Sequence, residues 1–125
     1  MEKSLPAKVV DCLSKKSIKE NYDLYGYLVS DEEEILLEYK AMRDLLIFTS
    51  KKIIAVDVQG LTGKKKEFLV LPYSKMTAFS VESAGSFDLD AECKLWASGV
   101  GYIELKFVRG TDVREISSIL VEKVG

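Results

Sequence analysis

Between residues 35 and 107 the hydrophobic positions follow a period of two, which is the spacing of side chains on one face of a β-strand. Ile103, Leu105 and Phe107, for example, are separated by charged residues. Two stretches, 45–48 and 53–56, are instead continuously apolar. Polar or glycine breaks separate the segments, and such a series of short strands is typical of a sandwich or barrel. We expect seven strands, at 35–40, 45–49, 53–58, 68–71, 77–81, 89–98 and 103–107.

The N-terminal segment follows a helical spacing instead. Val10 and Leu13 are three residues apart, and Tyr22 and Tyr25 repeat that spacing further along the chain. Positions three and four residues apart share one face of a helix. Residues 1–31 are therefore predicted to form one or two short helices whose apolar face docks on the domain or on a neighbour.

A second helix is predicted after the last strand. Asp112 is a suitable N-cap, with Glu115 placed to complete a capping box. Val113, Ile116 and Leu120 then fall on one face, and a helix this short must pack against something to be stable. We expect it to cover an open end of the sandwich, with Leu120 inside the core.

Length and composition indicate a single globular domain, assigned to residues 32–125 with residues 1–31 as its extension. Of the 125 residues, 47% are hydrophobic, which suffices for one core. The net charge of -2 argues against a nucleic-acid partner, which requires a basic face. No secretory signal or membrane-length apolar stretch is apparent, so a cytoplasmic location is expected, with Cys12 and Cys93 as reduced thiols.

Candidate catalytic chemistry is sparse. The chain contains no histidine, which is the most frequent general base and metal ligand. Asp88, Asp90 and Glu92 alternate along an expected strand and share one face, where they are either an oxygen-only divalent-cation site or a solvated acidic face. The second interpretation is preferred, so no catalytic residue, metal ligand or cofactor is predicted, and the protein is not expected to be an enzyme.

Seven antiparallel strands closed by a C-terminal helix is the arrangement of the pleckstrin-homology (PH) fold. Several short sequence motifs, which we call sequence words, indicate one particular family with this fold. In chain order these are Tyr39-Lys40, Arg43-Asp44, Phe48-Thr49, 59–65 (QGLTGKK), Pro72-Tyr73, 82–85 (ESAG), 88–92 (DLDAE) and Trp96. On these words the chain resembles the bacterial PH-domain family over residues 33–122. The resemblance implies a PH-like sandwich, a cytosolic location and relatives that assemble into ring-shaped homo-oligomers. Fold alone implies no activity.

The basic residues offer one alternative function. PH domains that bind phosphoinositides hold the headgroup between their first two hairpin loops, and the resemblance would place that site at Lys40, Arg43, Lys64, Lys65 and Lys66. The first loop is short and carries Asp44, which would repel a phosphate. Binding of anionic lipid headgroups or inositol phosphates is therefore the second hypothesis, and a membrane-lipid partner is not expected.

Aromatic residues outside the expected core support the preferred hypothesis. Trp96 and Tyr102 are predicted on polar strand faces, and Tyr22 and Tyr25 lie on the N-terminal helical face. Tryptophan and tyrosine often anchor interfaces; the alternative is a second, smaller core where the N-terminal segment folds back over the sheet. We therefore predict a non-catalytic interaction module that binds itself, as a ring of about five or six subunits. The sequence identifies no other protein partner.

Overall fold

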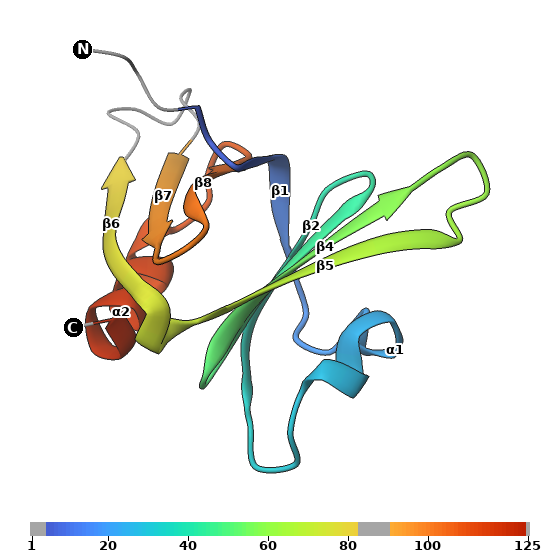
Figure 1. The fold of residues 1–125 in the computed structure, drawn as a ribbon, viewed down its shortest axis with the longest axis horizontal. Helices are drawn as coiled ribbons and strands as arrows, with labels where there is room; N and C mark the ends of the chain where they lie inside the picture. The colour runs from blue at the N-terminus through green and yellow to red at the C-terminus, as the bar shows by residue number, and fades with distance from the viewer. Residues whose placement is uncertain (1–4, 83–90, 125) are drawn as a thin grey trace.

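The structure, a computed structural model, describes residues 5–82 and 91–124, with the backbone alone at Cys12. Its strands form one bent sheet of eight, in the order β5-β4-β3-β2-β1-β8-β7-β6 (Figure 1). All seven predicted strands are present, and an eighth precedes them. The strands are β1 (Lys8–Lys16), β2 (Ile35–Lys40), β3 (Asp44–Thr49), β4 (Lys52–Gln59), β5 (Lys65–Pro72), β6 (Met76–Glu82), β7 (Ala91–Ala97) and β8 (Gly101–Phe107). The helices are α1 (Tyr22–Tyr25) and α2 (Val113–Val124), with 3-10 turns η1 (Gly26–Leu28) and η2 (Tyr73–Lys75).

Strand β1 corrects the prediction of a helical N-terminal segment. Its first part pairs with β8 in parallel, and residues 14–16 pair with β2 in antiparallel. The sheet is therefore mixed rather than purely antiparallel, and β1 joins its two halves. Register shifts between Val10 and Leu13, so both side chains are buried on the core side although they are three residues apart. This irregularity produced the spacing that resembles a helix.

The main core lies between the two halves of the bent sheet. Val10 and Leu13 of β1 contribute to it, together with alternate residues of the other strands such as Phe48 and Phe107. Tyr39 is fully buried there, and its ring meets those of Phe48 and Phe107 edge to face, at centroid distances of 6.1 and 5.0 Å. Burial raises the pKa of the Tyr39 phenol, which keeps it protonated.

Helix α2 covers this core as predicted, packing on β6 and η2. Ile116 and Leu120 are fully buried within it. The Asp112 carboxylate accepts a hydrogen bond from the Arg114 backbone N–H at 3.0 Å and so caps the helix. Glu115 does not complete a capping box; its carboxylate accepts a hydrogen bond from Lys15 of β1 at 2.8 Å, which ties the helix to the central strand.

A second, smaller core lies on the outer face of β2–β5, under α1 and η1. Tyr25 is fully buried in it, against residues such as Leu45, Ile54 and Val56. Because β3 and β4 are covered on both faces, their sequences are continuously apolar. The helical prediction for residues 1–31 therefore holds only over the short segment from Tyr22 to Leu28.

The buried carboxylate of Glu38 holds this covering segment in place. It accepts hydrogen bonds from the backbone N–H of Lys19 at 3.2 Å and of Asn21 at 2.8 Å. The Asn21 side-chain amide donates another at 2.9 Å, and the Tyr25 hydroxyl donates a fourth. Four donors replace the water that a buried carboxylate loses, so α1 is fixed to β2 at a defined position.

Candidate functional site

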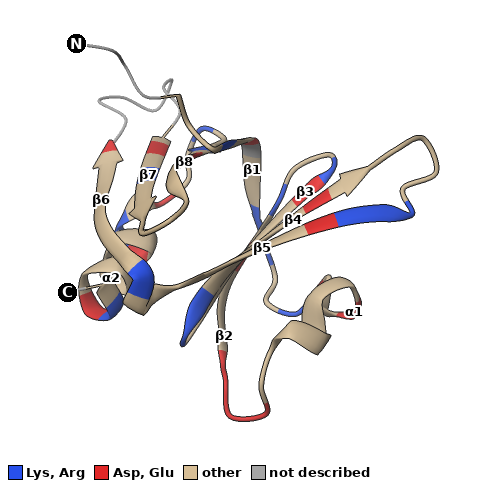
Figure 2. Cartoon of the chain, in the orientation of Figure 1, with Lys and Arg blue, Asp and Glu red and all other residues tan. Residues whose placement is uncertain are grey.

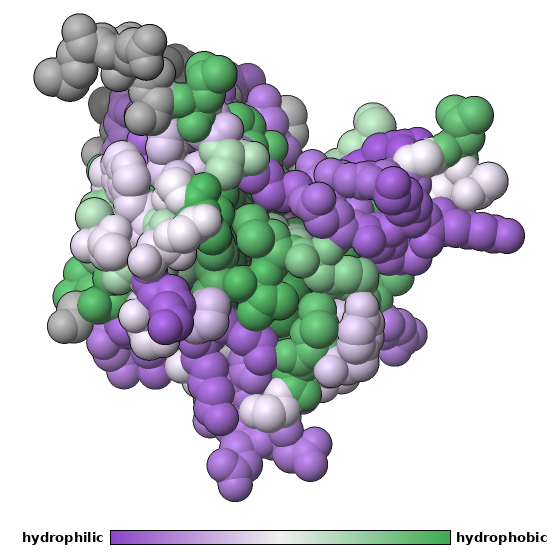
Figure 3. Space-filling view, in the orientation of Figure 1, coloured by the Kyte–Doolittle hydropathy of each residue, from purple (hydrophilic) through white to green (hydrophobic). Residues whose placement is uncertain are grey.

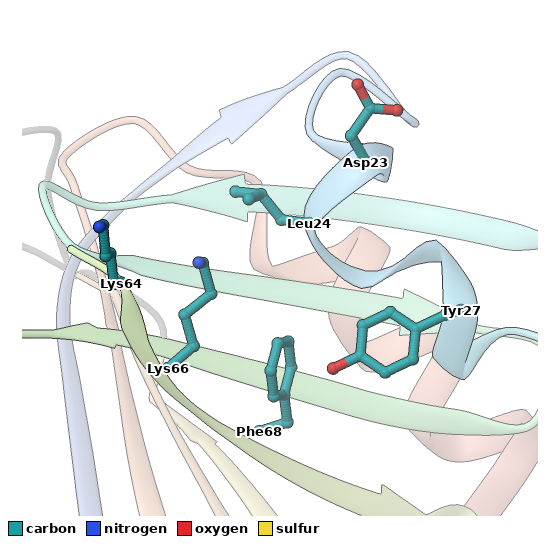
Figure 4. Close-up of a pocket in the computed structure, with 6 residues that line it drawn as sticks. All are labelled: Asp23, Leu24, Tyr27, Lys64, Lys66 and Phe68. Atoms are coloured by element: carbon teal, nitrogen blue, oxygen red, sulfur yellow. The ribbon is translucent and has the colours of Figure 1, made fainter.

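The described part of the chain contains an open groove between α1 and β5, with a volume of about 390 Å³ (Figure 4). Three of its residues come from the N-terminal segment and three from β5 and the turn before it. They are Asp23, Leu24, Tyr27, Lys64, Lys66 and Phe68. Tyr27 is 73% exposed and meets Phe68 edge to face, with ring centroids 5.6 Å apart. The groove therefore combines an aromatic floor with two lysines.

Strand alternation divides the three consecutive lysines. Lys64 and Lys66 line the groove, whereas Lys65 lies on the opposite face of β5, because successive side chains of a strand point to opposite sides. Lys40 is on β2, and both β3 and β4 separate it from β5. The five predicted anion-binding residues are therefore not brought together; only Lys64 and Lys66 share a site.

Arg43, one of the five predicted anion-binding residues, makes hydrogen bonds within its own chain. Its guanidinium donates a hydrogen bond to the Gly60 carbonyl at 2.8 Å, and its own carbonyl accepts one from the Val58 backbone N–H at 2.9 Å. These bonds connect the β2–β3 turn to the start of the β4–β5 turn. Arg43 thus braces the β4–β5 hairpin on which the lysines stand.

The other face of this hairpin is acidic. Asp57 of β4 and Glu67 of β5 each lie 3.6 Å from the Lys8 ammonium. Asp44 is opposite Asp57 in the register, and burial together with the Asp57 charge raises the pKa of its carboxyl. Lys8 therefore meets its partners on the core side, and these acids are held away from the groove.

The predicted interface aromatics separate into two groups. Trp96 and Tyr102 pair across β7 and β8 and stack, with ring centroids 5.6 Å apart and an interplanar angle of 27°. Both are partly exposed on the outer face of β6–β8. Tyr22 is also partly exposed, but Tyr25 is fully buried in its own chain, so its side chain cannot contact a neighbour. The alternative of a small second core is confirmed for Tyr25.

The outer face of β7 and β8 has a regular composition. The register places Glu92 opposite Lys106 and Lys94 opposite Glu104, in line with the stacked aromatic pair. No described helix covers this face (Figure 1). The adjacent edge strand β6 carries no charged residue from Thr77 to Val81, so its edge lacks the charges that usually discourage pairing.

Candidate reactive groups are few in the described part of the chain. Cys93 is buried on the core side of β7, and burial raises the pKa of its thiol to about 12, so it is not a nucleophile at neutral pH. No group of three potential metal ligands occurs among residues 5–82 and 91–124. Asp88 and Asp90 lie outside the described residues, as does the side chain of Cys12. None of the described helices is long and apolar enough to span a membrane.

Comparison with known proteins identifies the family. A sequence model described as "Bacterial PH domain" matches residues 5–124. The chain belongs to this family. The bacterial PH domain of a DUF1696 family protein from Shewanella loihica PV-4 is 36% identical, with a TM-score of 0.79 over 93% of this chain and 100% of that one. A second, from Shewanella amazonensis SB2B, is 40% identical, with a TM-score of 0.67 over 90% of this chain and 91% of that one.

Among curated proteins, the uncharacterized protein YjqA of Bacillus subtilis is 40% identical over 97 residues, which cover 76% of this chain and 78% of YjqA. The uncharacterized protein YozO of the same organism is 34% identical over 95 residues, or 76% of this chain and 82% of YozO. These similarities confirm the family that the sequence words indicated. The family match from residue 5 also includes β1 and α1, which the sequence words did not cover.

Proposed function

We propose that this bacterial PH domain is a non-catalytic cytoplasmic module that binds copies of itself. The observation that carries the proposal is the outer face of β6–β8, which no described helix covers and where the partly exposed rings of Trp96 and Tyr102 stack. An aromatic pair that a fold leaves partly exposed is a frequent interface anchor. β6 lies beside it as the edge strand of the described sheet and carries no charged residue from Thr77 to Val81, and an edge strand of this kind is suited to pairing with a neighbour.

The chemistry of the chain supports a binding role rather than catalysis. There is no histidine, and the one cysteine with a described side chain is buried with a raised pKa. The groove between α1 and β5 contains two lysines and two aromatic rings but no paired acid and base. The groove is therefore suited to binding a partner through charge and aromatic contacts, and it lacks the acid–base pair that general acid–base catalysis requires.

Light scattering after size-exclusion chromatography tests the proposal at micromolar concentration. We expect a mass of several multiples of 14.0 kDa, with about five or six subunits as the preferred count. A double variant with Trp96→Gln and Tyr102→Gln should have a lower mass. Val121→Gln, which changes an exposed residue of α2, is the control and should leave the mass unchanged.

A wild-type chain that scatters as a monomer would overturn the proposal. An oligomer of unaltered size in the double variant would instead move the contact away from β7 and β8.

A further inference from the structure

The described chain carries two unpartnered patches of opposite charge, at different ends of the molecule (Figure 2). One is the groove side of the β4–β5 hairpin, with Lys64 and Lys66. The other is the loop between η1 and β2, with Asp31, Glu32 and Glu34 exposed. None of these five side chains has an ion-pair partner within residues 5–82 and 91–124. Each patch therefore presents charge that its own fold does not neutralise.

The acidic loop is a rigid projection because its fourth carboxylate is turned inward. Glu33 is buried and accepts hydrogen bonds from Thr49, from the Lys52 ammonium at 2.9 Å and from the Ser30 backbone N–H at 3.1 Å. The backbone of Glu34 is bound to Ser50 in both directions, through the Ser50 hydroxyl and its N–H. The backbone that carries the three outward acids is thus held in place before any partner arrives, which lowers the entropy cost of binding.

The basic groove is equally pre-formed. Arg43 braces the hairpin through Gly60, and Glu38 fixes the α1 wall. Asp23 is the one acid that lines the groove, and its carboxylate points away from both lysine ammonium groups (Figure 4). The exposed Tyr27 beside Phe68 adds an aromatic anchor at the same place.

The two patches do not meet within one chain. The acidic loop and the hairpin point in different directions, as hydrophilic projections on either side of an apolar centre (Figure 3). We infer that the acidic loop of one copy, Asp31 to Glu34, docks into the groove that Lys64 and Lys66 line on the next copy. This inference rests on the proposed self-association and adds a head-to-tail contact to it. Such a contact uses different patches on the two partners and closes into a ring when the rotation permits.

Charge complementarity makes the contact specific and sensitive to salt. Lys66→Glu should weaken the assembly more than about tenfold, because it sets like charges against the acidic loop. Lys65→Glu is the matched control: it makes the same change of charge one residue away on the opposite face of β5, and should change the assembly little. Light scattering across a dilution series measures both.

Reciprocal charge reversal gives the sharpest test. The variants Lys64→Glu/Lys66→Glu and Asp31→Lys/Glu32→Lys should each lose the contact alone. Mixed in equal amounts, each supplies the patch that the other lacks, so the two should associate in alternation. The mass of the mixture should rise above that of either variant alone, and should reach the wild-type mass where the ring has an even number of subunits. A mixture whose mass stays at that of the separate variants, with both folded by circular dichroism, would overturn the head-to-tail contact.

The outcomes separate this inference from the proposed function. A monomeric wild type would reject self-association itself, and the contact with it. An oligomeric wild type whose mass is unaffected by Lys66→Glu would reject only the contact. Vesicles with anionic phospholipid serve as a third arm: binding that Lys66→Glu abolishes, with the assembly unchanged, would assign the groove to a membrane surface and overturn the inference.

Discussion

The two outer faces of the bent sheet differ although they belong to one hydrogen-bonded structure. The face of β2–β5 is covered by α1 and η1, and β3 is buried from Leu45 to Thr49 without interruption. The face of β6–β8 has no described cover, and β7 alternates strictly between buried and partly exposed residues. The sequence patterns differ in the same way, because a strand covered on both sides has no polar face to display. A continuous apolar run is therefore evidence that a further segment covers the sheet.

The largest expected effect is the loss of that cover. Tyr25→Ala should reduce the free energy of unfolding by about 3–5 kcal/mol, because a fully buried aromatic side chain is removed and Glu38 loses a hydrogen bond. Tyr27→Ala, two residues away and 73% exposed, is the control; it removes the contact with the Phe68 ring and should cost about 0.5–1.5 kcal/mol. Denaturant unfolding measures both. Equal losses of unfolding free energy in the two variants would show that the buried side chain of Tyr25 does not hold α1 and η1 on the sheet.

The C-terminal cover should be comparably sensitive at its buried positions. Leu120→Ala should cost about 2–5 kcal/mol, since Leu120 is fully buried in the main core. Val121→Ala changes the next residue, which is 65% exposed, and should have little effect on stability. A loss below about 1 kcal/mol for Leu120→Ala in urea unfolding would contradict its place in the core.

Acid should loosen the covered side through Glu33. Burial alone would raise the pKa of this carboxyl, but hydrogen bonds from Thr49, Lys52 and Ser30 together lower it below 4.5. Because the folded-state pKa lies below the unfolded-state value, Glu33 stabilises the fold above about pH 4.5, and this contribution is lost as the pH falls through the folded-state pKa. Glu33→Gln should therefore cost about 1–3 kcal/mol at pH 7.

The difference between wild type and Glu33→Gln should shrink as the pH falls from the ordinary pKa of a glutamate through the lower folded-state pKa of Glu33. Thermal unfolding across a pH series measures this convergence. Two curves that stay parallel down to the pH at which the wild type itself unfolds would show that the Glu33 carboxylate does not carry the pH dependence.

The smallest expected effect is on the uncovered face. A double-mutant cycle with Trp96→Ala and Tyr102→Ala should give a coupling free energy of about 0.5–1.5 kcal/mol, the usual value for an aromatic pair. Unfolding at protein concentrations where the chain is dissociated isolates this local contact. A coupling near zero would mean that the stacked pair contributes to association alone.

Most of the fold was predictable because its signals are local. The alternation in β7 and β8, the Asp112 cap and the stripe through Leu120 each depend on neighbours within a few residues. Strand β1 was misread for an equally local reason: its irregularity between Val10 and Leu13 replaces the period of two with a step of three. Nothing in the residues of β1 themselves reveals that its first part pairs with β8, near the other end of the chain.

The groove was not predictable in the same way. Tyr27 and Phe68 are distant in sequence, and they meet because Glu38 holds the segment from Lys19 to Tyr25. Alternation along β5 was readable in advance and would have separated Lys65 from its two neighbours. The sequence could therefore indicate which lysines share a face of β5. It could not indicate that the segment of α1 and η1 would pack beside that face and complete the groove.

The position of β1 also has a consequence for the order of events during synthesis. The strands from β2 to β5 follow one another as hairpins and can pair as soon as they are made, and residues 14–16 of β1 can pair with β2. The first part of β1 must instead wait for β8, which is almost a whole chain length away. Pairings of such long sequence separation are slow, since loop closure precedes any gain from contact. Val10→Ala should accordingly speed unfolding while leaving the folding rate nearly unchanged, in contrast to Ile54→Ala in β4. Equal effects on the folding rate in stopped-flow measurements would contradict this order, in which the pairing of β1 with β8 forms after the hairpins of β2–β5.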